Sequence, residues 1–357
     1  MTTQNLQEKS HDERFREKPY YAFDYYCKET FGSKLYKIAL DAGMTCPNRD
    51  GTLGTGGCIF CSRGGSGEFA IKRTAVSSID QTQHLVENYA RIPASSVLSM
   101  KEQLQKGQEL FHTKKTGDRF IAYFQAYTNT YAPVAYLEEI YIQALEEPSV
   151  SGISIATRPD CLGVDVLTLL SDLQTRYPDK FIWIELGLQT IHERTALYIR
   201  RGYELSCFEH ALAELSNRSI PVIVHVILGL PGETVADMLA TIQYLNQKLV
   251  GRFPMCGIKL QLLHVLQNTD LADAYDRQEF SVMTLEQYID TVVTCLEYLS
   301  PDIVIHRLTG DGPKDLLIAP LWSRNKRNVL NTLHSVMRQR QTFQGRTYHE
   351  SGSINIV

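Results

Sequence analysis

The chain has 357 residues, of which 43% are hydrophobic and 21% are charged, so it can build a sizeable core and wholesale disorder is excluded. Its 36 Lys and Arg residues nearly balance 40 Asp and Glu residues, and a net charge of −4 excludes a surface coated uniformly in positive charge. The length allows two or three domains, although α/β barrels commonly use about 250 residues as one unit.

The N-terminus gives no sign of export. It stays polar through Lys18, without the apolar segment and cleavage site of a signal peptide. The longest strongly apolar stretch, Val222–Leu230, is far shorter than the ~18 residues that a membrane helix needs. We therefore predict a cytoplasmic protein with no membrane partner. Its eight cysteines are then better explained by metal or redox chemistry than by disulfides.

Short apolar runs alternate with longer amphipathic stretches along the chain. Strands are predicted at residues 35–39, 120–124, 152–156, 181–186, 222–228 and 258–263, with a further short one at 303–305. Helices are predicted at residues 79–91, 100–111, 134–145, 164–176, 207–216, 234–249 and 285–299. This alternation indicates a parallel sheet, either open or rolled into a barrel. Polar and glycine residues collect after the strands, at the mouth where parallel barrels build their sites.

The C-terminal segment, residues 321–357, differs from the rest in charge. It carries six basic residues against Glu350 alone, and an apolar stripe that includes Leu333 and Met337 predicts a docked helix in its first half. Two interpretations explain these charges equally well. One is a solvated helical face, and the other is a surface that faces nucleic-acid phosphates.

Three cysteines lie close together after the first predicted strand. Cys46, Cys58 and Cys61 follow a C-x11-C-x2-C spacing in a loop that holds four glycines. Thiolates grouped in this way bind a soft metal or an iron–sulfur cluster, and glycine lets the backbone wrap closely around it. A structural zinc site completed by a distant histidine is the competing interpretation. The loop is expected at the mouth of the sheet, and this position favours a catalytic site over a structural metal site.

These motifs resemble a known group of enzymes. The three-cysteine loop, with Phe60 between its last two cysteines, is similar to that of the radical S-adenosylmethionine (SAM) superfamily. Together with Cys46-Pro-Asn-Arg-Asp-Gly and Thr157-Arg158-Pro159-Asp160, it resembles the YhcC/MnmL family, which is related to the radical domain of the Elongator catalytic subunit. We therefore expect a partial (β/α)6 TIM-like barrel over residues 34–320, with short extensions at residues 1–33 and 321–357.

The resemblance implies roles for particular residues. The three cysteines would bind three irons of a [4Fe–4S] cluster, SAM would chelate the fourth iron, and Phe60 would pack beside the adenine. One of Gln125, Thr128 and Asn129 would contact the methionyl amino group, because these residues follow the second strand. Further cofactor contacts are expected from a group of four residues later in the chain: Glu185, Gln189, Arg201 and His225.

Two of these residues also have ordinary structural explanations. His225 lies where relatives often use an acidic ribose ligand, but a histidine in an apolar strand is more commonly a core residue satisfied by the backbone. Ala156 stands where Elongator-like sequences have Glu, so the ribose contact is open at both positions. Arg201, with Arg200, could be a pair at a helix end.

The resemblance also implies a reaction and a substrate. Reductive cleavage of SAM would give a radical that abstracts hydrogen from a substrate carbon, with electrons from a donor such as flavodoxin or ferredoxin. The substrate would be the wobble uridine of transfer RNA, whose 5-carboxymethylaminomethyl side chain would be trimmed to 5-aminomethyl. Two alternatives are radical SAM chemistry on a small molecule and a non-catalytic, metal-stabilised RNA-binding protein.

Overall fold

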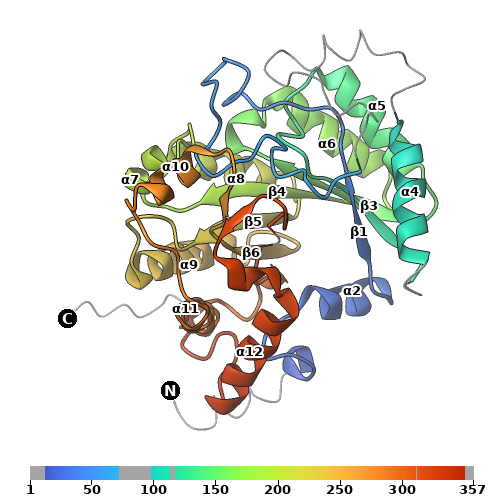
Figure 1. The fold of residues 1–357 in the computed structure, drawn as a ribbon. Coiled ribbons are helices and arrows are strands. Elements are labelled where there is room, and N and C mark those ends of the chain that lie inside the picture. Colours follow the sequence, from blue (N-terminus) through green and yellow to red (C-terminus); the bar gives the residue numbers. More distant parts are fainter. Residues whose placement is uncertain (1–12, 72–97, 113–116, 311, 350–357) are drawn as a thin grey trace.

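A curved parallel sheet forms the centre of the protein. The structure, a computed structural model, describes residues 13–71, 98–112, 117–310 and 312–349. Within this part of the chain, seven parallel strands pair in the order β1-β2-β3-β4-β5-β6-β8. Their bounds are Tyr36–Leu40, Phe120–Phe124, Val150–Thr157, Phe181–Gln189, Val222–Leu228, Cys256–Leu262 and Val304–Arg307. The sheet is the expected partial barrel with a seventh strand added at its end (Figure 1).

Helices follow the strands and cover the outside of the sheet (Figure 1). Their bounds are α4 Met100–His112, α5 Val134–Leu145, α6 Val164–Arg176, α7 Glu193–Tyr198, α8 Leu205–Asn217, α9 Val235–Leu249, α10 Asp270–Asp276 and α11 Leu285–Tyr298. Capping boxes at Thr234 and Thr284 begin α9 and α11 by satisfying backbone N–H groups of the first turn. The helix predicted at residues 79–91 lies outside the described residues.

Alternate residues of each strand face the helices and the barrel interior. The outward set is apolar and joins the main core, as with Ile153 and Ile155 on β3. The inward set forms layers, as in other parallel barrels. Its lowest layer includes Ile121, Trp183 and Ile223, which pack in one apolar cluster. The next inward-facing residues toward the carboxyl ends of the strands are polar, and they line the site described below.

The N-terminal segment closes the lower end of the barrel. Helix α2 (Phe23–Phe31) brings Phe23 against Trp183 and His306, with ring centroids 6.0 and 4.4 Å away. Ala22 forms a parallel bridge with Ile305, so the N-terminal segment also pairs with the last strand. This apolar plug excludes water from the bottom of the barrel and leaves the upper end open to ligands.

The C-terminal segment docks beside the N-terminal one. A two-stranded antiparallel sheet of β7 (Val265–Leu266) and β9 (Leu317–Ala319) precedes α12 (Lys326–Gln339). Val329, Leu333 and Met337 of α12 are buried, which confirms the predicted docked helix. Beyond it, the buried Gln344 accepts a hydrogen bond from the backbone N–H of Tyr21 at 2.9 Å, so the two extensions are tied together.

Candidate functional site

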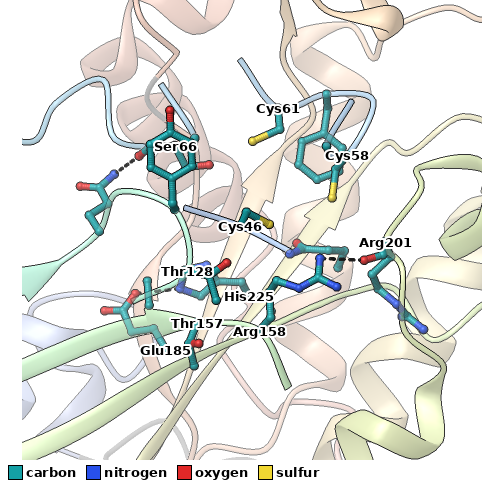
Figure 2. A pocket seen from close by; sticks show the side chains of 18 of the residues that line it. Cys46, Cys58, Cys61, Ser66, Thr128, Thr157, Arg158, Glu185, Arg201 and His225 are labelled. Carbon is teal, nitrogen blue, oxygen red and sulfur yellow. Dashed lines mark hydrogen bonds and ion pairs between the residues drawn. The ribbon is translucent and has the colours of Figure 1, made fainter. Parts of the chain in front are cut away.

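A cavity at the carboxyl end of the strands brings together nearly all the predicted site residues. Figure 2 shows Cys46, Cys58 and Cys61 above it, with Thr128, Glu185 and His225 lower down. Its lining includes the three cysteines, Phe60, Gln125, Thr128, Glu185, Gln189, Arg201 and His225. Asn129 is the exception among the predicted residues. It is fully buried and its Nδ2 donates to the carbonyl of Ala156 at 3.0 Å.

The cysteine loop is held by its own Asn and Arg. Asn48 Nδ2 donates to the carbonyl of Arg200 at 2.6 Å and lies 3.7 Å from Cys58 Sγ. Arg49 donates to the carbonyls of Cys61 and Ser62 at 2.7 and 2.5 Å. The Asn and Arg of the Cys-Pro-Asn-Arg motif therefore fix the conformation of the backbone that carries the thiols.

Close packing joins the cysteine loop to the segment after β2. Gly65 has a φ of 56°, and its carbonyl accepts a hydrogen bond from the backbone N–H of Tyr127 at 2.9 Å. A Cβ at Gly65 would lie 2.2 Å from a ring carbon of Tyr127, so only glycine fits here. Gln125 Nε2 also donates to the carbonyl of Ser66, at 2.7 Å.

The three thiols of the loop have the chemistry of iron–sulfur cluster ligands. All three are free and line one cavity. In the described part of the chain, no three His, Cys, Asp or Glu side chains converge closely enough to enclose one metal ion. A zinc site needs its ligands about 2.0 to 2.3 Å from one centre. A cluster takes its thiolates on separate irons, and three free thiols around one cavity fit that donor set.

Two of the three thiols, those of Cys58 and Cys61, have raised pKa values. Burial, with the nearby thiol of Cys61, raises the pKa of Cys58 to about 12. Burial also raises the pKa of Cys61, against the lowering effect of Arg49. Metal binding by Cys58 and Cys61 would therefore displace protons, and the positive charges of Arg158 and Arg49 would favour the resulting thiolates.

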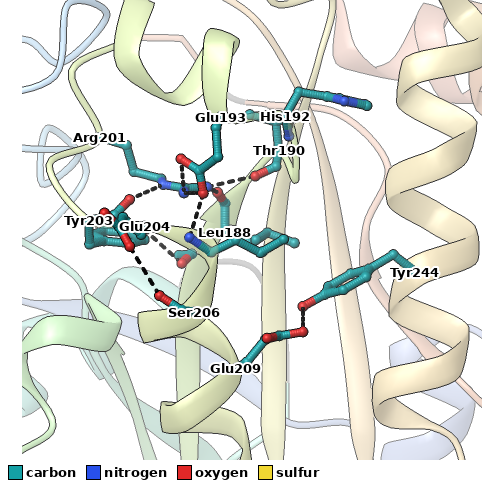
Figure 3. Close-up of polar contacts among 12 residues, drawn as sticks. Leu188, Thr190, His192, Glu193, Arg201, Tyr203, Glu204, Ser206, Glu209 and Tyr244 are labelled. Carbon is teal, nitrogen blue, oxygen red and sulfur yellow. Dashed lines mark hydrogen bonds and ion pairs between the residues drawn. The ribbon is translucent and has the colours of Figure 1, made fainter.

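Two buried arginines hold the loops beside the cysteines. Arg201 is 1% exposed, and it donates to the carbonyls of Leu188, Thr190 and Tyr203 at 3.1, 2.7 and 3.0 Å (Figure 3). Arg158 donates to the carbonyl of Arg201 at 2.9 Å and makes a two-point contact with Asp160. Because the donors of Arg201 are directed at these backbone groups, it is a positioning residue for the loop after β4.

A bulge at the end of β4 directs Gln189 to the cavity. The pairing of β4 with β5 shifts register between Gly187 and Gln189, and Gln189 has a φ of 67°. Positive φ is unfavourable for a residue with a side chain, so the surrounding structure must hold Gln189 in this conformation.

Glu185 is at the centre of a buried polar network. Its Oε1 accepts from Lys37 Nζ at 2.5 Å and from Ser154 Oγ at 2.7 Å. Its Oε2 accepts from His225 Nε2 at 2.7 Å and from Lys259 Nζ. Burial alone would raise the pKa of Glu185, but Lys259 and Lys37 hold it well below its usual value. Glu185 is therefore ionised and fully satisfied by the protein.

His225 belongs to the same network. Burial and the charge of Lys259 lower the pKa of His225 to about 4, so the ring is neutral at pH 7. Its contact with Glu185 assigns the proton to Nε2, and Nδ1 then accepts from Gln261 Nε2 at 3.3 Å. The histidine is thus not an apolar core residue, and the carboxylate of Glu185 fixes its tautomer.

Sequence reasoning missed several residues that line this cavity, most notably Lys259 and Arg307. Lys259 is 3% exposed and comes from β6. A signal was available, because Lys259 and Gln261 interrupt an apolar run at alternate positions, the spacing of one strand face. Arg307 lies at the end of β8, where the apolar run was too short to show a face.

The amino-acid sequence matches two known protein-family domains. Residues 51–245 match the radical SAM superfamily, and residues 255–339 match the Radical_SAM C-terminal domain. The chain belongs to the radical SAM superfamily. It is therefore an enzyme that uses a [4Fe–4S] cluster and SAM.

Relatives of this radical SAM enzyme extend over most of the chain. YtqA of Bacillus subtilis (strain 168) is 40% identical over 332 residues, which cover 93% of this chain and 94% of that protein. YhcC of Escherichia coli (strain K12) is 33% identical over 296 residues, covering 83% of this chain and 85% of that protein. Both likenesses confirm the family predicted from the cysteine loop.

More distant similarity reaches Elongator proteins. Elongator complex protein 3 of Schizosaccharomyces pombe is 23% identical over 335 residues, covering 86% of this chain and 59% of that protein. The solved structure of Elp3 from the archaeon Methanocaldococcus infernus aligns with a TM-score of 0.56 and 16% identity, over 71% of this chain and 63% of that one. The structural match supports the fold.

No helix in the described residues is both long and apolar enough to cross a membrane.

Proposed function

We propose that this radical SAM enzyme remodels the C5 side chain of the wobble uridine of transfer RNA, converting 5-carboxymethylaminomethyl to 5-aminomethyl. The observation that carries the proposal is the similarity to Elongator complex protein 3 over 86% of the chain, beside the higher identity to YhcC. The sequence resemblance to this group implies the wobble base as substrate. The reaction requires activation of a C–H bond next to nitrogen, which is within the reach of radical chemistry.

The cofactors would be held at the mouth of the barrel. With cluster and SAM bound, they supply a reactive carbon radical that removes hydrogen from a nearby substrate carbon. Cys46, Cys58 and Cys61 would each bind one iron, because they are the free thiols that line the cavity. The buried loop bonds of Asn48 and Arg49 would keep those thiols in position as ligands.

The remaining predicted contacts to SAM would come from other residues of the same cavity. Phe60 would pack beside the adenine, and Gln125 or Thr128 would contact the methionyl amino group. Gln189 and His225 would meet the rest of the cofactor, and Arg201 would act by holding the loop that carries Gln189. The apolar layer below this site supports the proposal because a carbon radical must be kept from water and stray C–H bonds.

Transfer RNA would be held outside the barrel. Residues 34–320 would form the catalytic barrel, and residues 321–357 would contact phosphates. Exposed arginines of that segment include Arg324, Arg327 and Arg338. Electrostatic contacts of this kind position an RNA without reading its sequence. The electron would come from a small donor such as flavodoxin or ferredoxin.

Two measurements test the proposal. Anaerobic reconstitution with iron and sulfide, followed by dithionite and SAM, should give absorbance near ~400 nm and 5′-deoxyadenosine. Nucleosides from the transfer RNA of a deletion strain should show 5-carboxymethylaminomethyluridine accumulating at the expense of 5-aminomethyluridine. An unchanged wobble profile would overturn the substrate and would favour radical chemistry on a small molecule instead.

A further inference from the structure

The interior of the barrel carries more positive than negative charge. Glu185 is its central carboxylate, and two lysines, Lys37 from β1 and Lys259 from β6, both donate to it. His225 also contacts Glu185, and it is neutral at pH 7 because burial and Lys259 lower its pKa to about 4. One carboxylate therefore faces two ammonium groups in a site largely removed from water, where an unbalanced charge is costly.

Lys259 is the lysine that lines the cavity. Its side chain is 4% exposed, its Nζ lies 3.1 Å from the hydroxyl of Tyr123, and the ammonium sits over the Tyr123 ring at 4.5 Å from the centroid. Lys37 contacts the same carboxylate but does not line the cavity. The two lysines thus share a partner and differ in what they present to a ligand.

Arg307 adds a further cation beside Lys259. The two residues are register partners on β8 and β6, and both line the cavity under the cysteine loop. Arg307 also lines a second cavity, which shares Phe60, Gln125 and His225 with the first and continues outward past His264 and Gly310. Lys259 and Arg307 therefore lie near the junction of these two cavities.

The surroundings of Lys259 disfavour its charged form despite the contact with Glu185. Burial lowers the pKa of Lys259 well below its usual value, and Lys37 and Arg307 lower it further, although Glu185 opposes this. A second carboxylate at the site would favour the charged lysine and remove the imbalance. Lys259 and Arg307 offer two cationic groups to a carboxylate ligand at this place in the cavity.

We propose that Lys259, together with Arg307, binds a carboxylate of the substrate inside the barrel. The inference rests on the proposed function, in which the substrate side chain ends in a carboxylate and the product side chain ends in an ammonium. The same two cations would attract the first and repel the second, so they would select the untrimmed side chain and assist release of the trimmed one.

The test compares acid and ester forms of one substrate. Reconstituted full-length enzyme is given transfer RNA bearing either 5-carboxymethylaminomethyluridine or its methyl ester, and KM and kcat are measured for each. Wild type should prefer the acid by about 10- to 100-fold in KM, the worth of a hydrogen bond to a charged group. Lys259→Met should lose that preference, and Arg307→Gln should reduce it.

Lys37→Met is the matched control. It removes an ion pair to the same Glu185, yet it should keep the preference for the acid because Lys37 does not line the cavity. Equal loss in both lysine variants would mean a purely structural effect and would overturn the proposal. SAM affinity of Lys259→Met is measured in parallel, and a fall as large as the change in KM would assign the lysine to the carboxylate of SAM instead.

A second readout does not depend on transfer RNA. Ligand-observed NMR with N-methylglycine and its amide should show wild type binding the acid and not the amide, with the acid signal lost in Lys259→Met. If the transfer RNA is not turned over but this selectivity is found, the proposed substrate fails and the carboxylate site stands. If the transfer RNA is turned over with equal KM for acid and ester, the carboxylate site fails and the proposed function stands.

Discussion

Replacing Glu185 with Gln tests whether the network in the barrel stabilises the fold through charge. The Glu185 side chain is 0% exposed and that of Lys259 is 4% exposed, so the substitution leaves a buried ammonium without its counter-charge. Breaking a buried ion pair by removing one partner costs about 3–5 kcal/mol. The amide oxygen still accepts one hydrogen bond, which places the expected loss near the lower end, about 3 kcal/mol.

The assay is urea unfolding of the metal-free protein at pH 7 in reducing buffer, followed by circular dichroism. The midpoint should fall without a change in slope, and the melting temperature should drop by roughly 5–10 °C. Adding Lys259→Met to Glu185→Gln should recover about half of the loss, because the unpaired charge is then gone. A loss below about 0.5 kcal/mol, or a double variant less stable than Glu185→Gln, would refute the charge argument.

Three further predictions concern the same site. Replacing Cys46, Cys58 or Cys61 with alanine should abolish the ~400 nm absorbance and 5′-deoxyadenosine formation. The control variant Cys207→Ala, on α8 outside the cavity, should retain both. The lowered pKa of His225, about 4, means that stability should fall as pH drops from about 6.5 toward 4, and His225→Gln should reduce the slope by about 1.4 kcal/mol per pH unit in urea unfolding. An unchanged slope would contradict this. Arg201→Lys should cost about 2–4 kcal/mol and weaken SAM binding because lysine cannot reach three carbonyls, while the exposed Arg176→Lys should change stability by less than about 0.5 kcal/mol.

Much of the fold could be predicted from local patterns. The strands at residues 120–124 and 222–228 and the helices at 134–145 and 164–176 have the predicted bounds, because buried strands and amphipathic helices leave clear periodicities. Helices α7 and α10 were not predicted, since 6 and 7 residues are too few to show a helical period. The N-terminal helix α2 was also missed, and its aromatic residues make sense only against Trp183 and His306.

The sequence by itself indicated the superfamily and its cofactors through a family resemblance, whose central motif of three thiols in a glycine-rich loop is encoded within 16 residues. Only the tertiary structure decided what lies beneath that loop. Lys37 and Glu185 are 148 residues apart in sequence, and Glu185 and Lys259 are 74 apart. They meet because the sheet curves, so that inward-facing residues of distant strands converge on one axis. Strand periodicity marks each residue as inward or outward, but the curvature decides which charges share the interior.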